Sequence, residues 1–344
     1  MIRVLVVDDS AVVRELLAYI LSSDPEIEVA AIVPDGEAAL EAVQRHKPDV
    51  VTMDIHMPRK NGFEATRQIM ETHPTPIVIV SGSSSIDEVA TTFHAMEAGA
   101  LAVVPRPPGL GHPDHKALAR ELTQTVKLMS EVKVVRRWER ARRAASPPPV
   151  QVGPSADEVR LVVIGASTGG PVALQTILAD LPADFRVPIV IVQHIAAGFV
   201  QGFVEWLAQA SGRPVRVAVH GARLQPGMAY VGPDGVHVTV DGEGRIALVE
   251  GQPMNGLCPS ASILLRSAAA FGPRAVGVLL TGMGKDGAEE LRLMKENGAI
   301  TIAQDKESSV IHGMPGEAIR LGGATYELPP EGIAAALAAL VKQK

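Results

Sequence analysis

Short apolar runs alternate with longer amphipathic stretches along the chain, in two successive series. The first series occupies residues 2–7, 50–53, 77–80 and 101–104, and the second occupies residues 161–164, 189–193 and 275–281. The runs are short and rich in Val, Ile and Leu, which favours strands buried on both faces, and the stretches between them favour helices. The pattern therefore predicts an α/β protein with two doubly wound, mostly parallel sheets.

Between the two series lies a segment without hydrophobic periodicity. Residues 133–143 carry six basic residues and one acid, and residues 144–158 are rich in Pro, Ser and Gly. Such a composition is typical of a solvated helix end followed by a semi-extended linker. Since 344 residues suffice for two domains, we predict one domain at residues 1–125, a linker at 126–158 and a second domain at 159–344.

Composition narrows the class of protein. A net charge of -6 argues against a broad nucleic-acid-binding surface. No apolar run approaches the roughly 20 residues that span a bilayer, and no signal peptide is evident, so we expect a cytoplasmic protein without direct membrane insertion. The single cysteine, Cys258, cannot form an internal disulfide, and we expect a buried, inert thiol.

Acidic residues follow two strands of the first predicted sheet. Asp8 and Asp9 come directly after residues 2–7, and Asp54 comes directly after residues 50–53. Three carboxylates at neighbouring strand ends repel one another, and a hard divalent cation such as Mg²⁺ would relieve the repulsion. Asp54 could then act as a nucleophile toward a phosphoryl group. The structural alternative is capping, with Asp9 or Ser10 as the N-cap of the following helix.

In the second series a glycine-rich loop follows the first strand. Residues 165–170 (GASTGG) fit two structures: a phosphate-binding loop at a helix N-terminus, or a nucleophile elbow of the form G-x-S-x-G that exposes Ser167. A dinucleotide site would need an acid after the next strand, where the chain has His194. Asp286 follows the third strand, so we expect Ser167, His194 and Asp286 at one edge of the sheet.

These three residue types form the working set of a serine hydrolase. The hydroxyl attacks, the imidazole takes its proton and the carboxylate orients the imidazole, without any cofactor. Backbone amides near Thr168 and Met283 are candidate oxyanion donors. Taken singly, His194 could be a core or capping histidine, and Asp286 the N-cap of a helix. Residues 228–240 (MAYVGPDGVHVTV) predict a hairpin around Pro-Asp-Gly.

Four motifs of the first domain resemble the bacterial response-regulator receiver domain. They are residues 4–14 (VLVVDDSAVVR), 53–62 (MDIHMPRKNG), 79–82 (IVSG) and 104–107 (VPRP). The resemblance implies a flavodoxin-like fold in which Asp54 accepts phosphate from a histidine kinase. It further implies a Mg²⁺ site formed by Asp8, Asp9, Asp54 and the His56 carbonyl.

The same resemblance assigns the switch region and marks two departures. Ser81 takes the position of the switch hydroxyl. Arg106 stands where receivers usually carry a lysine, which keeps the charge but replaces a point-like ammonium with a planar fork. Val103 occupies the position of the usual aromatic switch residue, so an aromatic swing is not expected.

Five motifs of the second domain resemble the catalytic domain of the chemotaxis protein-glutamate methylesterase family, CheB. They are residues 164–170 (IGASTGG), 191–195 (IVQHI), 279–288 (LLTGMGKDGA), 303–310 (AQDKESSV) and 312–318 (HGMPGEA). The resemblance implies hydrolysis of glutamate methyl esters on chemoreceptor cytoplasmic helices, often with deamidation of glutamines, and it assigns the triad to Ser167, His194 and Asp286. The chain departs from the family at residues 195–197, where Met-Pro is common, and at 255–262, which lack His-Arg-Pro-Ser.

Pairing a switch domain with a hydrolase suggests regulation. We expect the receiver to cover the esterase cleft until Asp54 is phosphorylated. Three other classes of protein agree less well with the sequence. A transcriptional regulator needs a helix-turn-helix and a basic face, and a nucleotide-binding enzyme needs the acid that His194 replaces. A signalling scaffold with a degenerate catalytic site is compatible with the altered substrate loops, and esterase activity would exclude it.

Overall fold

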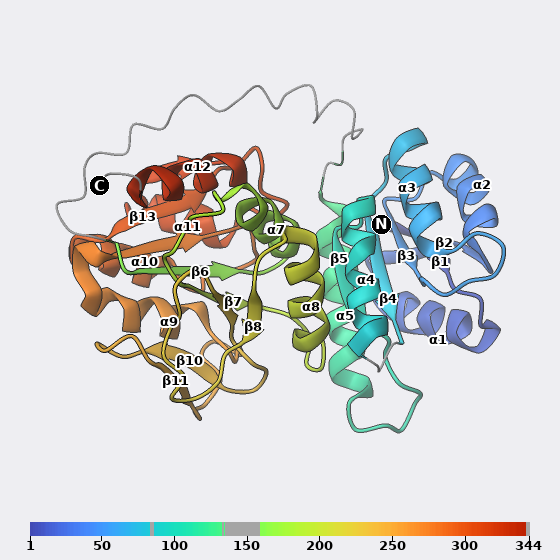
Figure 1. The fold of residues 1–344 in the computed structure, drawn as a ribbon. Helices are drawn as coiled ribbons and strands as arrows, with labels where there is room; N and C mark the ends of the chain where they lie inside the picture. Colours follow the sequence, from blue (N-terminus) through green and yellow to red (C-terminus); the bar gives the residue numbers. More distant parts are fainter. Residues whose placement is uncertain (83–85, 133, 135–158, 342–344) are drawn as a thin grey trace. The chain divides into compact units, whose positions relative to one another are not determined.

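The computed structural model describes residues 1–82, 86–132, 134 and 159–341 (Figure 1). The chain divides into two compact units, Met1–Ala145 and Ser146–Lys344. Apart from Val134, the basic run and the Pro-rich segment of the predicted linker lie outside the described residues. No helix in the described ranges has both the length and the apolar content needed to cross a bilayer.

The first unit is a parallel five-stranded sheet with helices between successive strands (Figure 1). The strand order is β2-β1-β3-β4-β5, which is the order of the flavodoxin-like fold. β3 and β4 are buried along their whole length, as their continuous apolar sequences predict. The elements are β1 (Ile2–Val7), α1 (Ala11–Ser22), β2 (Ile27–Val33), α2 (Gly36–His46), β3 (Val50–Met53), α3 (Gly62–Thr72), β4 (Ile77–Ser81), α4 (Ile86–Ala98), β5 (Ala102–Pro105) and α5 (His115–Ser130).

The last helix of this unit extends further than expected. Because α5 continues to Ser130, the predicted domain boundary at residue 125 falls inside a helix. Leu122, Val126 and Met129 are all fully buried and recur at helical spacing, so one apolar stripe packs the C-terminal half of α5 against the sheet.

The second unit contains a parallel seven-stranded sheet in the order β14-β13-β12-β6-β7-β9-β8. α7, α8 and α12 form one group of contacting helices, and α9, α10 and α11 form another. The elements are β6 (Leu161–Ala166), α7 (Gly170–Asp180), β7 (Ile189–Gln193), α8 (Val200–Ser211), β8 (Val215–Val217), β9 (Ala229–Val231), β10 (His237–Val240), β11 (Ile246–Val249), α9 (Ala261–Ala268), the 3₁₀ helix η1 (Ala269–Arg274), β12 (Ala275–Leu279), α10 (Ala288–Glu296), β13 (Ile300–Gln304), α11 (Met314–Arg320), β14 (Tyr326–Leu328) and α12 (Pro330–Val341).

The strand order creates a switch point next to β6. The chain proceeds from β6 to β7 on one side, whereas from β12 it proceeds to β13 on the other. Loops that follow two such strands diverge and leave a crevice at the carboxyl edge of the sheet, where ligands of open α/β sheets bind. Ser167 lies just after β6, and Asp286 lies in the connection that follows β12.

Two smaller expectations are wrong. The segment 228–240 is not a hairpin, because β9 pairs in parallel with β7 and β8 while β10 pairs antiparallel with β11. A turn does form at Asp234 and Gly235, but the strands on its two sides enter different sheets. Cys258 is only partly buried, since it lies in the loop before α9 rather than in the core.

Candidate active site

The register of the sheet brings the loops after β6, β7 and β12 together. Ala166 pairs with Gln193, so Ser167 and His194 are the next residues on adjacent strand ends, and the His194 amide donates to the Ala166 carbonyl at 2.9 Å. On the other side of β6, the Ser167 amide donates to the Thr281 carbonyl at 3.0 Å. The predicted nucleophile is therefore fixed from both neighbouring strands.

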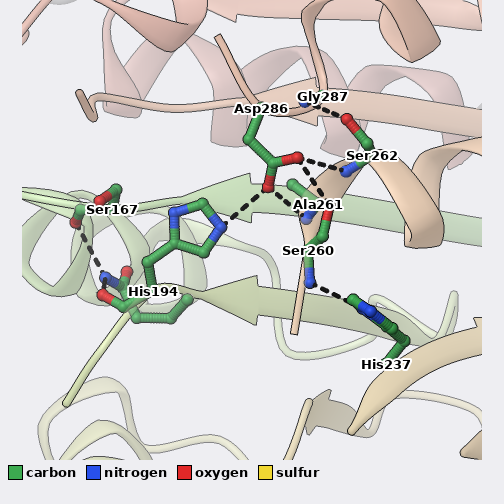
Figure 2. Close-up of polar contacts among 9 residues, drawn as sticks. Ser167, His194, His237, Ser260, Ala261, Ser262, Asp286 and Gly287 are labelled. Carbon is green, nitrogen blue, oxygen red and sulfur yellow. Dashed lines mark hydrogen bonds and ion pairs between the residues drawn. The ribbon is translucent and has the colours of Figure 1, made fainter. Parts of the chain in front are cut away.

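His194 and Asp286 form a direct pair, although they are far apart in sequence. His194 Nε2 lies 2.9 Å from Asp286 Oδ2. Because a carboxylate of lowered pKa only accepts, Nε2 carries the hydrogen, and Nδ1 is the ring nitrogen that can act as a base. Figure 2 shows the imidazole between Asp286 and Ser167, with its second nitrogen toward the Ser167 side. The structure thus brings all three predicted residues into one site.

The Asp286 carboxylate receives three further hydrogen bonds from the start of α9 (Figure 2). Oδ1 accepts from Ser260 Oγ at 2.7 Å and from the Ser262 amide at 3.1 Å, and Oδ2 accepts from the Ala261 amide at 2.6 Å. Burial by itself would raise the pKa of Asp286, but the hydrogen bonds from His194 and Ser260 outweigh it and lower the pKa to about 2. Asp286 therefore stays ionised at any pH at which a histidine base works.

Ser260 and its neighbours are functional residues that the sequence interpretation missed. Ser260 occupies the N-cap position of α9, yet its hydroxyl makes no capping bond to its own helix. The hydroxyl donates to Asp286 instead, and the Asp286 carboxylate accepts the first amides of α9 in the place of a local cap. A Ser-Ala-Ser sequence at the start of an apolar helix predicts where the helix begins. It does not predict that a carboxylate distant in sequence accepts the first amides of that helix.

Close packing surrounds the loop that carries Ser167. A Cβ at Gly282 would lie 2.6 Å from the Cβ of Ser167, and a Cβ at Gly170 would lie 2.2 Å from Gln193 Oε1. Gln193 Nε2 donates both to the Ser167 carbonyl at 2.8 Å and to the His194 carbonyl at 2.9 Å. One amide thus ties the backbones of the nucleophile and the base, and the glycines allow that approach.

The two candidate oxyanion donors lie in the glycine-rich loops beside Ser167. Among the residues that the structure describes, neither the Thr168 amide nor the Met283 amide donates a hydrogen bond. The Thr168 carbonyl is anchored by Thr281 Oγ1 at 3.0 Å, and the Met283 side chain is about half exposed. Neither amide is thus occupied by another acceptor among the described residues, and their role as oxyanion donors remains a prediction.

The three acids of the first unit also converge. One carboxylate oxygen each from Asp8, Asp9 and Asp54 all lie within 4.8 Å of one another. Asp8 is fully buried, and its Oδ2 has no hydrogen-bond partner among the residues that the structure describes. Burial raises the pKa of Asp8 to about 6, and burial likewise raises the pKa of Asp54. A buried carboxylate oxygen without a hydrogen bond, beside two further acids, fits the oxygen ligand set of Mg²⁺.

The capping alternative for these acids is not supported. Ser10 holds the N-cap position of α1, but its side chain makes no capping bond. Asp8 Oδ1 accepts the Ser10 amide at 2.9 Å, and its Oδ2 lies 3.9 Å from Arg106 Nη2. His56 is exposed two residues beyond Asp54, and its carbonyl as a metal ligand remains a prediction.

Ser81 is the last residue of β4, and Arg106 directly follows the neighbouring strand β5. Ser81 is buried with its Oγ 3.4 Å from Thr92 Oγ1. Arg106 Nη2 lies 3.5 Å from Asp54 Oδ1 and 3.9 Å from Asp8 Oδ2. Its guanidinium covers Gly82, where an added Cβ would lie 2.7 Å from Arg106 Cζ, so the glycine makes room for the arginine.

Comparison with known proteins identifies a family for each of the two units. The family model for the CheB methylesterase matches residues 162–337, and that for the response regulator receiver domain matches residues 4–111. A protein-glutamate methylesterase/protein-glutamine glutaminase of Nitrosospira multiformis is 59% identical over 100% of this chain and 98% of its own length, and one of Geobacter metallireducens is 57% identical over the full length of both.

A solved structure extends the likeness to three dimensions. The CheB methylesterase catalytic domain of Thermotoga maritima matches with a TM-score of 0.52 and 36% identity, covering 54% of this chain and 100% of that domain. Family models, full-length relatives and this structure all point to the same two-domain family. The chain therefore belongs to the CheB methylesterase family and carries a response regulator receiver domain.

Proposed function

We propose that this chain is a protein-glutamate methylesterase, and also a protein-glutamine glutaminase, whose activity rises when its receiver domain is phosphorylated. The substrates are glutamate methyl esters and glutamines on the cytoplasmic helices of chemoreceptors, so the enzyme works in the cytoplasm during sensory adaptation. The observation that carries the proposal is the His194–Asp286 pair beside Ser167 at the switch point of the sheet.

The hydrolytic steps follow from the geometry. Ser167 Oγ attacks the ester carbonyl carbon while His194 Nδ1 takes the hydroxyl proton, and the negative oxygen is stabilised by the amides of Thr168 and Met283. His194 then gives the proton to the departing methoxide, so methanol leaves and an acyl-enzyme remains on Ser167. His194 then takes a proton from a water that attacks this ester, and it returns the proton to Ser167 Oγ as the receptor's glutamate side chain is released. A glutamine substrate releases ammonia instead of methanol in the first step.

Asp286 supports each of these steps without changing its own protonation. Its ionised carboxylate holds Nε2 of His194 as a donor and stabilises the imidazolium that forms during attack. Because the pKa of Asp286 is lowered to about 2, the carboxylate does not take the proton itself.

In the receiver domain Asp54 is the phosphoryl acceptor, with a histidine kinase as donor. Asp8, Asp9, Asp54 and the His56 carbonyl would hold Mg²⁺, which when bound offsets the negative charge of phosphoryl oxygens. Arg106 lies 3.5 Å from Asp54 and supplies a second positive charge for the same oxygens, and Ser81 senses the new group from the end of β4.

Methanol release from methylated receptor membranes tests the hydrolytic assignment. Ser167→Ala should abolish release while Asp54 still accepts phosphate from a small phosphodonor, because the two sites belong to different units. Retention of the full rate in Ser167→Ala would show that another group is the nucleophile.

A further inference from the structure

A buried histidine outside the proposed triad makes hydrogen bonds that reach Asp286. His237 begins β10, is only 4% exposed, and belongs to the two-stranded sheet rather than to the sheet that carries the triad. Figure 2 shows its ring beside Ser260, on the side away from His194. None of the steps described above uses this imidazole.

The partners of His237 determine which of its nitrogens carries the hydrogen. Nε2 lies 3.2 Å from the Gln252 carbonyl, which can only accept, so Nε2 is protonated. The Ser260 amide donates to Nδ1 at 3.2 Å, so Nδ1 must present a lone pair. Both contacts are satisfied only by the neutral imidazole with its hydrogen on Nε2.

Ser260 transmits this contact to the triad. Its amide bonds to His237 while its hydroxyl bonds to Asp286 Oδ1, and the residue is fully buried. As the N-cap residue of α9, Ser260 sets the direction of the Ala261 amide, which also bonds to Asp286. A shift of Ser260 would therefore move two donors of the Asp286 carboxylate at once.

We propose that His237 is a positioning residue for ester hydrolysis. By accepting the Ser260 amide, it fixes the start of α9 and thereby the orientation in which Asp286 holds His194. The inference rests on the proposed roles of Ser167, His194 and Asp286, and it adds a buried support on β10 to them.

The chain supplies a matched control for a merely structural role of β10. The Val240 amide, at the other end of β10, donates to Ser267 Oγ on α9 at 3.1 Å. This bond also ties β10 to α9, but it lies a turn and a half further along the helix from the donors of Asp286. Ser267→Ala removes such a tie without touching Ser260.

Two substitutions at residue 237 distinguish the role of Nδ1 from that of Nε2. In His237→Asn the amide oxygen can occupy the place of Nδ1 and accept the Ser260 amide, whereas in His237→Gln the polar end reaches the place of Nε2 and serves only Gln252. We expect methanol release from methylated receptor membranes to keep its kcat within about threefold in His237→Asn. In His237→Gln we expect kcat to fall about ten- to a hundredfold with little change in KM, the range typical of small misplacements of catalytic groups.

Ser267→Ala should lower the melting temperature of the catalytic domain yet keep kcat. Equal loss in His237→Asn and His237→Gln, or loss in Ser267→Ala as large as in His237→Gln, would overturn the inference in favour of general stability. Should the 237 variants fail to fold, hydrogen exchange of the Ser260 amide in the wild-type enzyme decides: slow exchange is expected, and fast exchange contradicts the proposal. Turnover by Ser167→Ala would instead refute the triad itself.

Discussion

Replacing Asp8 with asparagine should stabilise the metal-free receiver domain while it removes the Mg²⁺ site. Asp8 is fully buried, and its Oδ2 has no hydrogen-bond partner among the described residues. Burial and the charges of Asp54 and Asp9 disfavour its ionised form, and they outweigh the attraction of Arg106, which lies 3.9 Å away. Asparagine keeps the shape and the oxygen that accepts the Ser10 amide, but it carries no charge.

The magnitude follows from the pKa of Asp8. Burial raises this pKa from 3.8 to about 6. Since one pKa unit corresponds to about 1.4 kcal/mol, ionising Asp8 at pH 7 lowers the free energy of unfolding by about 3 kcal/mol. The folded carboxyl binds its proton more tightly than the unfolded one. The contribution of protonated Asp8 to the free energy of unfolding is therefore fully present below the unfolded pKa of 3.8. It is lost as the pH rises through the folded pKa of about 6.

Scanning calorimetry of the full chain in EDTA measures this effect. The receiver transition is the one that Mg²⁺ raises in the wild type. At pH 7, Asp8→Asn should raise the melting temperature of the receiver domain by about 10 °C. This shift is the free-energy gain divided by the unfolding entropy, which is about 2.1 cal/mol/K per residue in a domain of this size. At pH 4 most of the difference in melting temperature between variant and wild type should vanish. Adding Mg²⁺ should no longer raise the melting temperature of the variant.

Asp114 is 70% exposed and lies outside the acid cluster, so Asp114→Asn should change the free energy of unfolding by no more than about 0.5 kcal/mol. If Asp8→Asn were no more stable than the wild type at pH 7, or if its advantage persisted at pH 4, the buried-charge explanation would be wrong.

Four further substitutions, two of them combined in one variant, test other contacts. Asp286→Asn should lower kcat by about 10³- to 10⁴-fold in methanol release, because the amide cannot hold His194 as the charged carboxylate does; a loss under tenfold contradicts this role. Ser260→Ala removes a hydrogen bond to a buried charge and should lower the free energy of unfolding of the catalytic domain by about 1.5–3 kcal/mol in urea titrations; no loss would show that the bond is dispensable. Gly82→Ala should weaken beryllofluoride binding by displacing the guanidinium of Arg106, whereas adding Arg106→Lys should cancel that loss; equal weakening in both backgrounds would mean that Gly82 acts otherwise.

The sequence predicted the parts of the sites that depend on local signals. The strands before Ser167, His194 and Asp54 are short apolar runs that end in polar residues, and parallel strands bring such ends to one edge. For this reason the convergence of Ser167, His194 and Asp286 follows from the order of strands and polar residues along the chain. The same reasoning placed Asp8, Asp9 and Asp54 together, and the structure brings them within 4.8 Å.

What the sequence could not predict depends on long-range pairing. The bond between Ser260 and Asp286 joins two loops that no local pattern links, and Ser260 by itself indicates only a helix start. The hairpin prediction at residues 228–240 failed for a similar reason. Its turn is real, but β9 enters the seven-stranded sheet between β7 and β8, while β11 provides the partner of β10. The end of α5 at Ser130 is decided by burial against the sheet rather than by a stop signal.

The central claim is a serine esterase switched by phosphorylation of Asp54, and one assay tests it most directly. Methanol release from methylated receptor membranes is measured for wild type, Ser167→Ala and Asp54→Asn, with and without Mg²⁺ and a small phosphodonor. We predict stimulated release in the wild type, unstimulated release alone in Asp54→Asn and none in Ser167→Ala. Stimulation that persists in Asp54→Asn, or release by Ser167→Ala, would contradict the claim.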